Sequence, residues 1–121
     1  MLTENLQIYR DLFELSKRLM VYSKDISKVI RYGEYSTALS MTLQSMDLVY
    51  VANSDRIQRI AAIQNILQLI GGVRSRVRLF VESGYINVKR ATALQYYIDR
   101  IGKQATGWRN ASQSQSYGVA R

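Results

Sequence analysis

Residues 54–83 read SDRIQRIAAIQNILQLIGGVRSRVRLFVES, and the prediction of the fold starts from this stretch. Its apolar residues recur at alternating intervals of three and four, which is typical of one face of a helix. The series consists of Ile60, Ile63, Leu67, Ile70, Val77 and Val81. Arg74 occupies the position at which this series calls for an apolar side chain. Because a guanidinium on the buried side of a helix is costly unless it meets an anion, Arg74 is the first indication of an anionic partner.

Three further series of apolar residues predict helices on either side of this stretch. They lie at about residues 3–28, 34–52 and 87–110, and each repeats with helical spacing. Connections this short make neighbouring helices antiparallel. We therefore predict an all-α, up-down-up-down four-helix bundle formed by residues 1–110. Residues 111–121 are polar, continue none of the series, and are predicted to form a mobile tail.

Glycine and asparagine residues mark the predicted helix ends. Gly84 is suited to follow the third helix, Asn87 to cap the fourth, and residues 53–54 to separate the second helix from the third. Gly71 and Gly72 lie inside the third helix, where each glycine costs up to ~1 kcal/mol relative to alanine. We interpret this pair as a point of close packing against a neighbouring helix. The alternative is a bend, or a place where a partner approaches.

The composition argues against catalysis and metal binding. The 121 residues include no cysteine and no histidine, so thiolate chemistry, the commonest general base and the commonest metal ligand are all missing. Asp11 and Glu14 are the closest pair of carboxylates on one helix face. They alternate with Arg10, Lys17 and Arg18, as on a solvated and salt-bridged surface. We expect no catalytic residue, no cofactor and no metal site.

The sequence also contains no recognisable membrane anchor. No apolar run approaches the ~20 residues that a membrane-spanning helix needs. The first residues carry acidic side chains early and lack the apolar core of a signal peptide. We therefore expect a cytoplasmic protein that does not enter a membrane.

Charge is distributed unevenly along the chain. The sequence holds 17 Lys and Arg against 9 Asp and Glu, a formal net charge of +8. Residues 1–55 contain six basic and seven acidic side chains, whereas residues 56–121 contain eleven basic and only two acidic ones. A one-sided excess of this kind indicates an anionic partner, of which nucleic acid is the commonest. The alternative is a generally basic protein surface without a specific partner.

Arginines of the third predicted helix are the leading candidates for contact with that partner. Arg74 and Arg78 lie one helical turn apart and share a face, whereas Arg76 points away from both. Lys89 and Arg90 open the fourth helix, which should place them near Arg78 in an antiparallel bundle. The remaining candidates are Arg56, Arg59, Arg100 and Lys103. Such side chains suit phosphate contacts, which bind without reading the base sequence.

Four short motifs in this order give the chain a family resemblance. They are R-Y-G-E at residues 31–34, V-A-N at 51–53, the arginine-rich segment at 73–80, and I-G-K-Q followed by G-W at 101–108. With this order and a basic four-helix bundle, the chain resembles the accessory variability determinant proteins of diversity-generating retroelements. These proteins are related to the intervening-sequence four-helix-bundle proteins. The S-I-P-A-N-I-A-E-G signature of that second branch is absent here.

The resemblance implies a partner, an assembly and a role. Proteins of this family form a pentameric barrel with a basic surface and a central pore. They bind the reverse transcriptase of the retroelement together with template RNA and cDNA, and support mutagenic copying without catalysing it. Family contacts on the third helix match Arg74 and Arg78 by position. In such a barrel, Arg74 would face the pore or a subunit boundary. The family's loop after the first helix often carries a proline, which is missing from residues 28–31 here.

Two other functions remain open at this stage. One is a general RNA-associated four-helix bundle that has no polymerase partner. The other is a structural bundle whose basic surface binds an acidic protein. The three readings differ in whether RNA is bound and whether a reverse transcriptase accompanies it.

Overall fold

The computed structural model describes residues 1–120, and of residues 116–120 only the backbone. All regular structure in this range is helical, which confirms the predicted all-α class. The elements are η1 (Thr3–Asn5), α1 (Gln7–Tyr22), η2 (Ser23–Asp25), α2 (Lys28–Ile30), η3 (Arg31–Tyr35), α3 (Ser36–Ser54), α4 (Arg59–Glu82) and α5 (Val88–Ala120). Within residues 1–120, no helix is both long enough and apolar enough to cross a lipid bilayer.

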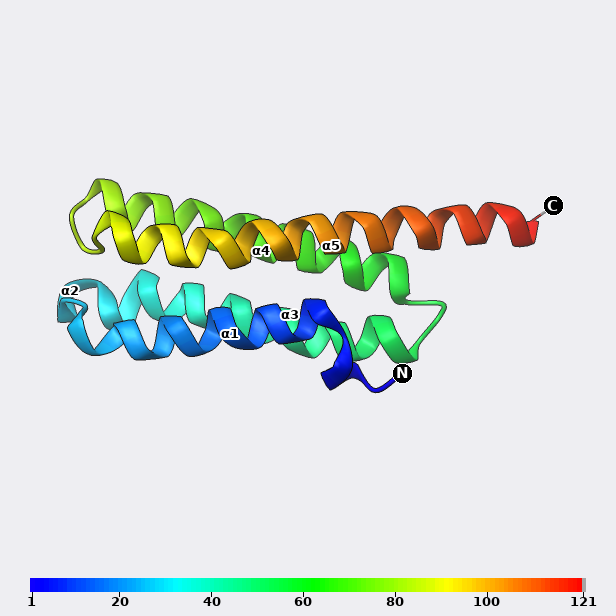
Figure 1. Ribbon diagram of the computed structural model, residues 1–121, viewed down its shortest axis with the longest axis horizontal. Helices are drawn as coiled ribbons and strands as arrows, with labels where there is room; N and C mark the ends of the chain where they lie inside the picture. Colours follow the sequence, from blue (N-terminus) through cyan, green and yellow to red (C-terminus); the bar gives the residue numbers. More distant parts are fainter. Residues whose placement is uncertain (121) are drawn as a thin grey trace.

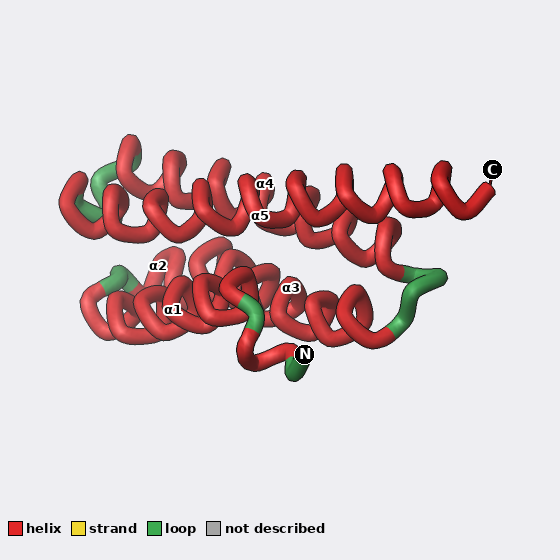
Figure 2. The backbone as a smooth tube through the Cα atoms, turned by 45° about the vertical axis from the view of Figure 1, so that its right-hand side comes forward, coloured by secondary structure: helices red, strands yellow, loops and turns green. Residues whose placement is uncertain are grey.

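The four long helices form the predicted antiparallel bundle in two layers. Figure 1 shows α1 and α3 in one layer and α4 and α5 in the other. Each long helix packs against two others, because α3 contacts α4, α4 contacts α5, and α1 contacts both α3 and α5. The connections α3–α4 and α4–α5 are short turns at opposite ends of the bundle, whereas residues 23–35 form a longer, partly helical connection between α1 and α3 (Figure 2). The nearly neutral first half of the chain therefore forms one layer, and the strongly basic second half forms the other.

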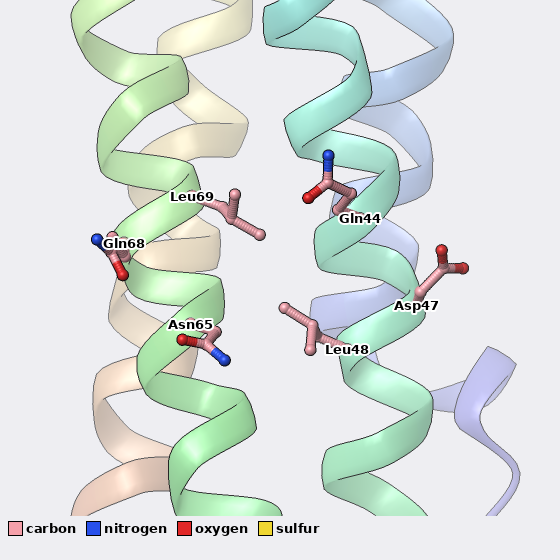
Figure 3. Close-up of a pocket in the computed structure, with 6 residues that line it drawn as sticks. All are labelled: Gln44, Asp47, Leu48, Asn65, Gln68 and Leu69. Atoms are coloured by element: carbon pink, nitrogen blue, oxygen red, sulfur yellow. The ribbon is translucent and has the colours of Figure 1, made fainter.

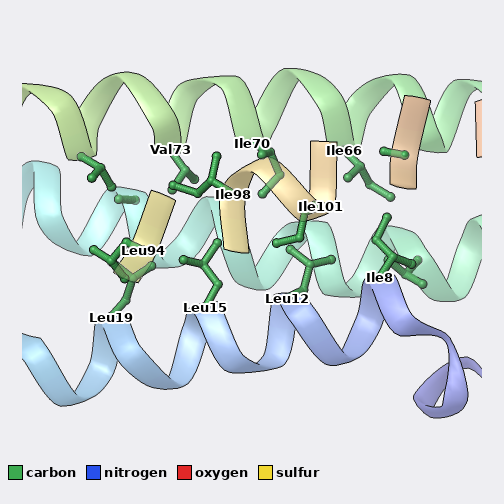
Figure 4. Close-up of a cluster of buried hydrophobic side chains, with 14 of the residues drawn as sticks. Ile8, Leu12, Leu15, Leu19, Ile66, Ile70, Val73, Leu94, Ile98 and Ile101 are labelled. Carbon is green, nitrogen blue, oxygen red and sulfur yellow. The ribbon is translucent and has the colours of Figure 1, made fainter. Parts of the chain in front are cut away.

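Apolar side chains from all four long helices fill the space between the layers. Leu12, Leu15 and Leu19 of α1 point toward α4 and α5, where Ile98 and Ile101 meet them (Figure 4). Full burial of an aliphatic side chain of this size stabilises a fold by roughly 1.5–3 kcal/mol. The largest fully buried side chains are Tyr35, Phe80, Leu12, Leu15, Leu19, Ile63, Ile66, Leu94, Ile98, Ile101, Val49 and Val73.

The buried face of α4 differs from the predicted one, and Arg74 is not part of it. Val73 fills the core position, while Arg74 lies next to it on the exposed surface. In the same way Ile66 and Phe80 are buried in place of the predicted Leu67 and Val81. Ile63, Ile70 and Val77 are buried as predicted. The other positions were predicted one residue too late because residues 66–67 and 80–81 are pairs of apolar neighbours, and continuing that series placed Arg74 instead of Val73 on the buried face. The interpretation of Arg74 as an arginine on the buried side of the helix was therefore wrong.

The first connection is more structured than a simple loop. The predicted helix over residues 3–28 ends at Tyr22, and the chain continues through η2, α2 and the π-helical turn η3. The side chain of Tyr35 is buried and its hydroxyl donates to the carbonyl oxygen of Leu19 at 2.6 Å. The guanidinium of Arg31 donates to the carbonyl oxygen of Ile26 through Nε at 3.0 Å and Nη2 at 2.7 Å. The bonds from Arg31 satisfy a carbonyl oxygen at the break between η2 and α2, whereas the bond from Tyr35 adds to that from the backbone N–H of Ser23, which already donates to Leu19.

Two predicted helix boundaries are confirmed and two are wrong. Gly84 adopts a φ of 81°, and Asn87 Oδ1 accepts from the backbone N–H of Arg90 at 2.8 Å. Residues 53–54 do not cap α4: its N-cap residue is Gln58, and Asp55 Oδ1 orders the turn before the helix by accepting from the N–H of Ile57 at 3.0 Å and of Gln58 at 3.1 Å. The predicted end of the last helix near residue 110 is also wrong, because α5 continues to Ala120. Residues 111–117 contain neither glycine nor proline to stop it. Arg121 lies outside the described residues.

The two glycines inside α4 have different surroundings. A Cβ at Gly72 would overlap the terminal methyl group of Met41 on α3, so Gly72 confirms the interpretation as close packing. A Cβ at Gly71 would meet no atom within 4 Å. The helix runs through both residues without interruption. Only one of the two glycines is therefore required by the packing.

Replacing Gly71 by alanine should stabilise the protein. Because the added methyl group meets nothing, the gain in helix propensity is expected at about 1 kcal/mol, or about 4 °C in Tm. Gly72→Ala is the matched control, and its gain should be smaller or negative because Met41 must move. Thermal unfolding followed by circular dichroism measures both. A lower Tm for Gly71→Ala than for Gly72→Ala would contradict this account.

Candidate nucleic-acid interface

An ion pair joins the two helices of the basic layer. Arg74 Nη1 on α4 donates to Asp99 Oδ1 on α5 at 2.7 Å. The same carboxylate oxygen accepts from Nε2 of Gln95 at 2.9 Å. Both charged side chains are about half exposed, at 47% for Arg74 and 49% for Asp99. Arg74 is therefore available to solvent, and its partner is an aspartate that water also reaches.

The surroundings of Asp99 keep its carboxyl group ionised. The hydrogen bonds from Gln95 and then Arg74 lower its pKa below 3.8, and the charge of Lys103 acts in the same direction. Partial burial acts in the opposite direction without cancelling the two hydrogen bonds, so the pKa of Asp99 is lowered. Near neutral pH, Asp99 is thus a permanent negative charge between Arg74 and Lys103.

Two hollows follow the boundary between α4 and α5 and meet at Arg74. One has a volume of about 610 Å³ and includes Arg74, Asp99 and Lys103 in its lining. The other has a volume of about 410 Å³ and includes both Arg74 and Arg78. Gly102 and Gly107 line the first hollow, where their lack of side chains leaves space beside α4. The result is a shallow groove bordered by three cations.

Arg78 and Lys103 are the most accessible of these cations. Arg78 pairs only with Glu82 on its own helix, at 3.5 Å, and 79% of its side chain is exposed. Lys103 is exposed and has no ion pair among the described residues. The prediction that Arg74 and Arg78 share a face is confirmed, since both line the second hollow. We call the surface formed by Arg74, Arg78 and Lys103 the basic groove.

Arg76 lies on a different side of α4, as predicted. Its Nε donates to Glu34 Oε2 at 2.9 Å, and its Nη1 donates to the carbonyl oxygen of Gly72 at 3.2 Å. Glu34 belongs to the turn before α3, so Arg76 connects the two layers. Only 28% of its side chain is exposed. Arg76 therefore lies outside the basic groove.

Arg90 and Arg100 point from α5 toward α1. Arg90 Nη2 pairs with Asp25 Oδ2 at 2.9 Å, and Arg100 Nε pairs with Asp11 Oδ2 at 3.1 Å. The side chain of Asp11 is only 5% exposed. Both arginines lie on the boundary between α1 and α5, away from the basic groove. The basic surface that we expected along the last helix is thus divided between two sides of α5.

The other three candidates lie at the ends of the bundle. Arg59 donates to the carbonyl oxygens of Ala52 at 2.6 Å and Asn53 at 3.3 Å, and so closes the end of α3. Arg56 is exposed in the turn before α4, and Lys89 is exposed in the first turn of α5. Neither forms an ion pair within residues 1–120.

Sequence reasoning did not identify the carboxylates that pair with these arginines. Five of the nine candidate cations have a carboxylate partner in the same chain. Asp25, Glu34 and Asp11 come from segments 42 to 89 residues away from the arginines they contact. Only the i,i+4 pair of Arg78 and Glu82 has a local spacing that a sequence displays.

A further hollow, between α3 and α4, was not anticipated from the sequence. It has a volume of about 420 Å³ and is lined by Gln44, Asp47, Leu48, Asn65, Gln68 and Leu69 (Figure 3). Three amides supply most of its polar groups, and Asp47 is its only charged lining residue. This hollow is therefore poorly suited to hold an anion.

Comparison with models of protein families and with curated proteins finds no match for this chain. The fold and the geometry of the charged surface consequently carry the functional argument. Together they define a basic, antiparallel four-helix bundle with a cationic groove between α4 and α5.

Asp11 and Asp99, which each pair with an arginine of another helix, should differ in their effect on stability. Asp11 is buried and also accepts from Gln7 at 3.1 Å and Gln104 at 2.7 Å, so Asp11→Ala should cost about 2 kcal/mol. Asp99→Ala removes only an exposed pair and should change the free energy of unfolding by about 0.5 kcal/mol or less. Urea denaturation measures both values. Equal losses for the two variants would contradict this assignment of burial.

The pKa of Asp99 should depend on its two hydrogen-bond donors, Gln95 and Arg74. Since its folded pKa lies below 3.8, the pair stabilises the fold above about pH 4, and this contribution disappears as the pH falls further. Gln95→Ala and Arg74→Ala should each raise the pKa toward 3.8. Carboxyl-detected NMR titration checks this. An unchanged pKa in both variants would show that the two donors do not act on this group.

Proposed function

We propose that this chain is a non-catalytic nucleic-acid-binding protein that holds a phosphate backbone in the basic groove. The observation that carries the proposal is the position of Arg74, Arg78 and Lys103 along one groove of the layer formed by the basic half of the chain. Cations arranged along a groove suit a linear polyanion better than a single small anion. Phosphate contacts of this type position a nucleic acid without reading its bases.

The ion pairs within the chain do not oppose this function at the basic groove. Exposed pairs such as Arg74 with Asp99 and Arg78 with Glu82 contribute only about 0–1 kcal/mol to stability. Both guanidinium groups are therefore free to exchange a carboxylate for a phosphate, to which arginine can bind through two parallel hydrogen bonds. Nine acidic side chains also leave eight of the 17 basic charges uncompensated.

On the resemblance, the specific role proposed is that of an accessory subunit of a diversity-generating retroelement. It would bind the reverse transcriptase and hold template RNA or cDNA during mutagenic reverse transcription. The four-helix bundle and the basic groove on its third and fourth long helices support this proposal. The R-Y-G-E motif supports it as well. Arg31 donates to the carbonyl oxygen of Ile26, and Glu34 accepts from Arg76, so the motif fixes the turn between α1 and α3. Assembly into a homo-oligomer, with a pentamer as the family form, belongs to the same proposal.

Removing two cations from the basic groove should weaken RNA binding without unfolding the protein. Arg74→Ala combined with Arg78→Ala is expected to lower the affinity for RNA and to reduce the slope of log K against log salt by about 1.4. Arg10→Ala combined with Lys17→Ala is the matched control. It removes the same charge from exposed positions on α1 and should change RNA binding much less. Fluorescence anisotropy over a range of salt concentrations measures both.

Several outcomes would contradict the proposal at different levels. Equal losses in the two double variants would show a nonspecific effect of net charge. Unchanged RNA affinity after loss of Arg74 and Arg78 would exclude the basic groove.

Co-purification with a reverse transcriptase tests the polymerase partner. RNA binding without such a partner would indicate the general RNA-associated bundle. If the chain binds no RNA and its complex with a protein partner survives nuclease treatment, the structural bundle that binds an acidic protein would be indicated.

A further inference from the structure

Arginine and tyrosine side chains alternate along the boundary between α1 and α5. Arg90 lies over the ring of Tyr22 with its Cζ 4.5 Å from the ring centroid. Arg18 lies over the ring of Tyr97 at 5.2 Å. Hydrogen bonding to the hydroxyl oxygens of Tyr22 and then Tyr97 raises the pKa of Arg18. The residues that we call the arginine–tyrosine seam are Arg90, Tyr22, Arg18, Tyr97, Tyr96 and Arg100.

The seam continues along α5 to an exposed tyrosine. Tyr96 meets the ring of Tyr97 edge to face, with centroids 5.0 Å apart, and Arg100 lies over the ring of Tyr96 at 5.4 Å. Tyr96 is 55% exposed and the side chain of Arg100 is 41% exposed. More than half of the Tyr96 surface therefore faces water although it lies next to two ordered planar groups.

The charge of the seam is positive and incompletely compensated. Among the described residues Arg18 has no ion pair, and its buried Nε has no hydrogen-bond partner. Arg90 and Arg100 have Asp25 and Asp11 as partners. Asp11 is buried beneath the surface, so a ligand would meet the guanidinium of Arg100 before it met that carboxylate. The seam thus presents flat aromatic and guanidinium surfaces together with a net positive charge.

The arginine–tyrosine seam and the basic groove lie along two sides of α5. Tyr96, Arg100 and Lys103 are spaced i, i+4 and i+7 on α5, so they lie along one exposed line of that helix. Lys103 also borders the basic groove. No aromatic residue lines either hollow of that groove. A strand whose phosphates occupy the groove could reach the exposed ring of Tyr96 on the seam.

We infer that the arginine–tyrosine seam stacks unpaired bases and makes this protein select single-stranded nucleic acid over a duplex. Bases of a single strand stack on aromatic rings and on guanidinium planes, whereas in a duplex their faces are covered by neighbouring base pairs. This inference rests on the proposed function, because it adds base contacts to the phosphate contacts of the basic groove. The ligand class is single-stranded RNA or DNA without a fixed sequence.

An abasic strand separates base stacking from phosphate binding. The probes are an oligoadenylate strand and a strand of equal length and charge that carries abasic sites. The unmodified protein should bind the oligoadenylate about tenfold more tightly, because stacking contributes roughly 1–3 kcal/mol per base. Tyr96→Leu should remove most of this difference and leave the affinity for the abasic strand unchanged. Phe13→Leu is the matched control, since Phe13 is 52% exposed on the other layer, and it should change neither affinity.

The outcomes of this binding experiment separate the stacking inference from the proposed function. Tm should be nearly unchanged in Tyr96→Leu, since the ring is mostly exposed. Equal loss for both strands in that variant, or equal affinity of the unmodified protein for both strands, would overturn the stacking inference alone. Failure of the unmodified protein to bind either strand would overturn the proposed function itself. If Tyr96→Leu does not fold, quenching of 2-aminopurine fluorescence on binding to the unmodified protein still tests stacking, and no quenching would count against it.

Discussion

The structure depends on burial of two apolar rows of α4 against the other helices. Ile63, Ile70 and Val77 form one row and Ile66, Val73 and Phe80 form the other, each with a spacing of seven residues. These rows fix the rotation of α4 about its own axis. Once they are buried, the direction of every arginine on that helix follows. The apolar residues thereby determine which cations border the basic groove and which one bonds across the layers.

The division of charge along the chain becomes a division between layers because the helices follow one another in order. The nearly neutral residues form α1 and α3, and the basic residues form α4 and α5 (Figure 1). Asp11, Asp25 and Glu34 each reach from the first half of the chain to an arginine of the second half. These contacts hold the layers together and reduce the number of free arginines. Of the candidate cations of the basic layer, Arg74, Arg78 and Lys103 remain accessible along the basic groove.

The sequence was sufficient to predict the helical class, the number of long helices and their antiparallel order, because apolar periodicity and short connections determine these features. It did not define the rotation of α4, since residues 66–67 and 80–81 each offer two adjacent apolar side chains for the core. It also did not show that Arg90 and Arg100 turn toward α1, because Asp25 and Asp11 are distant in sequence. The common face of Arg74 and Arg78 was predictable because it depends only on local helical spacing.

The buried carboxylate of Asp11 also determines how far α1 is displaced along α5. Its oxygens accept hydrogen bonds from Arg100 and Gln104, whose positions on α5 are fixed by the helix. Sliding α1 by one helical turn, about 5.4 Å, would separate this buried carboxylate from one of the two donors, because Arg100 and Gln104 are themselves one turn apart. Leucine and isoleucine contacts alone tolerate such a slip better, because one aliphatic side chain replaces another. A single acidic residue thus selects one alignment of the two helices among several that the apolar surface would accept.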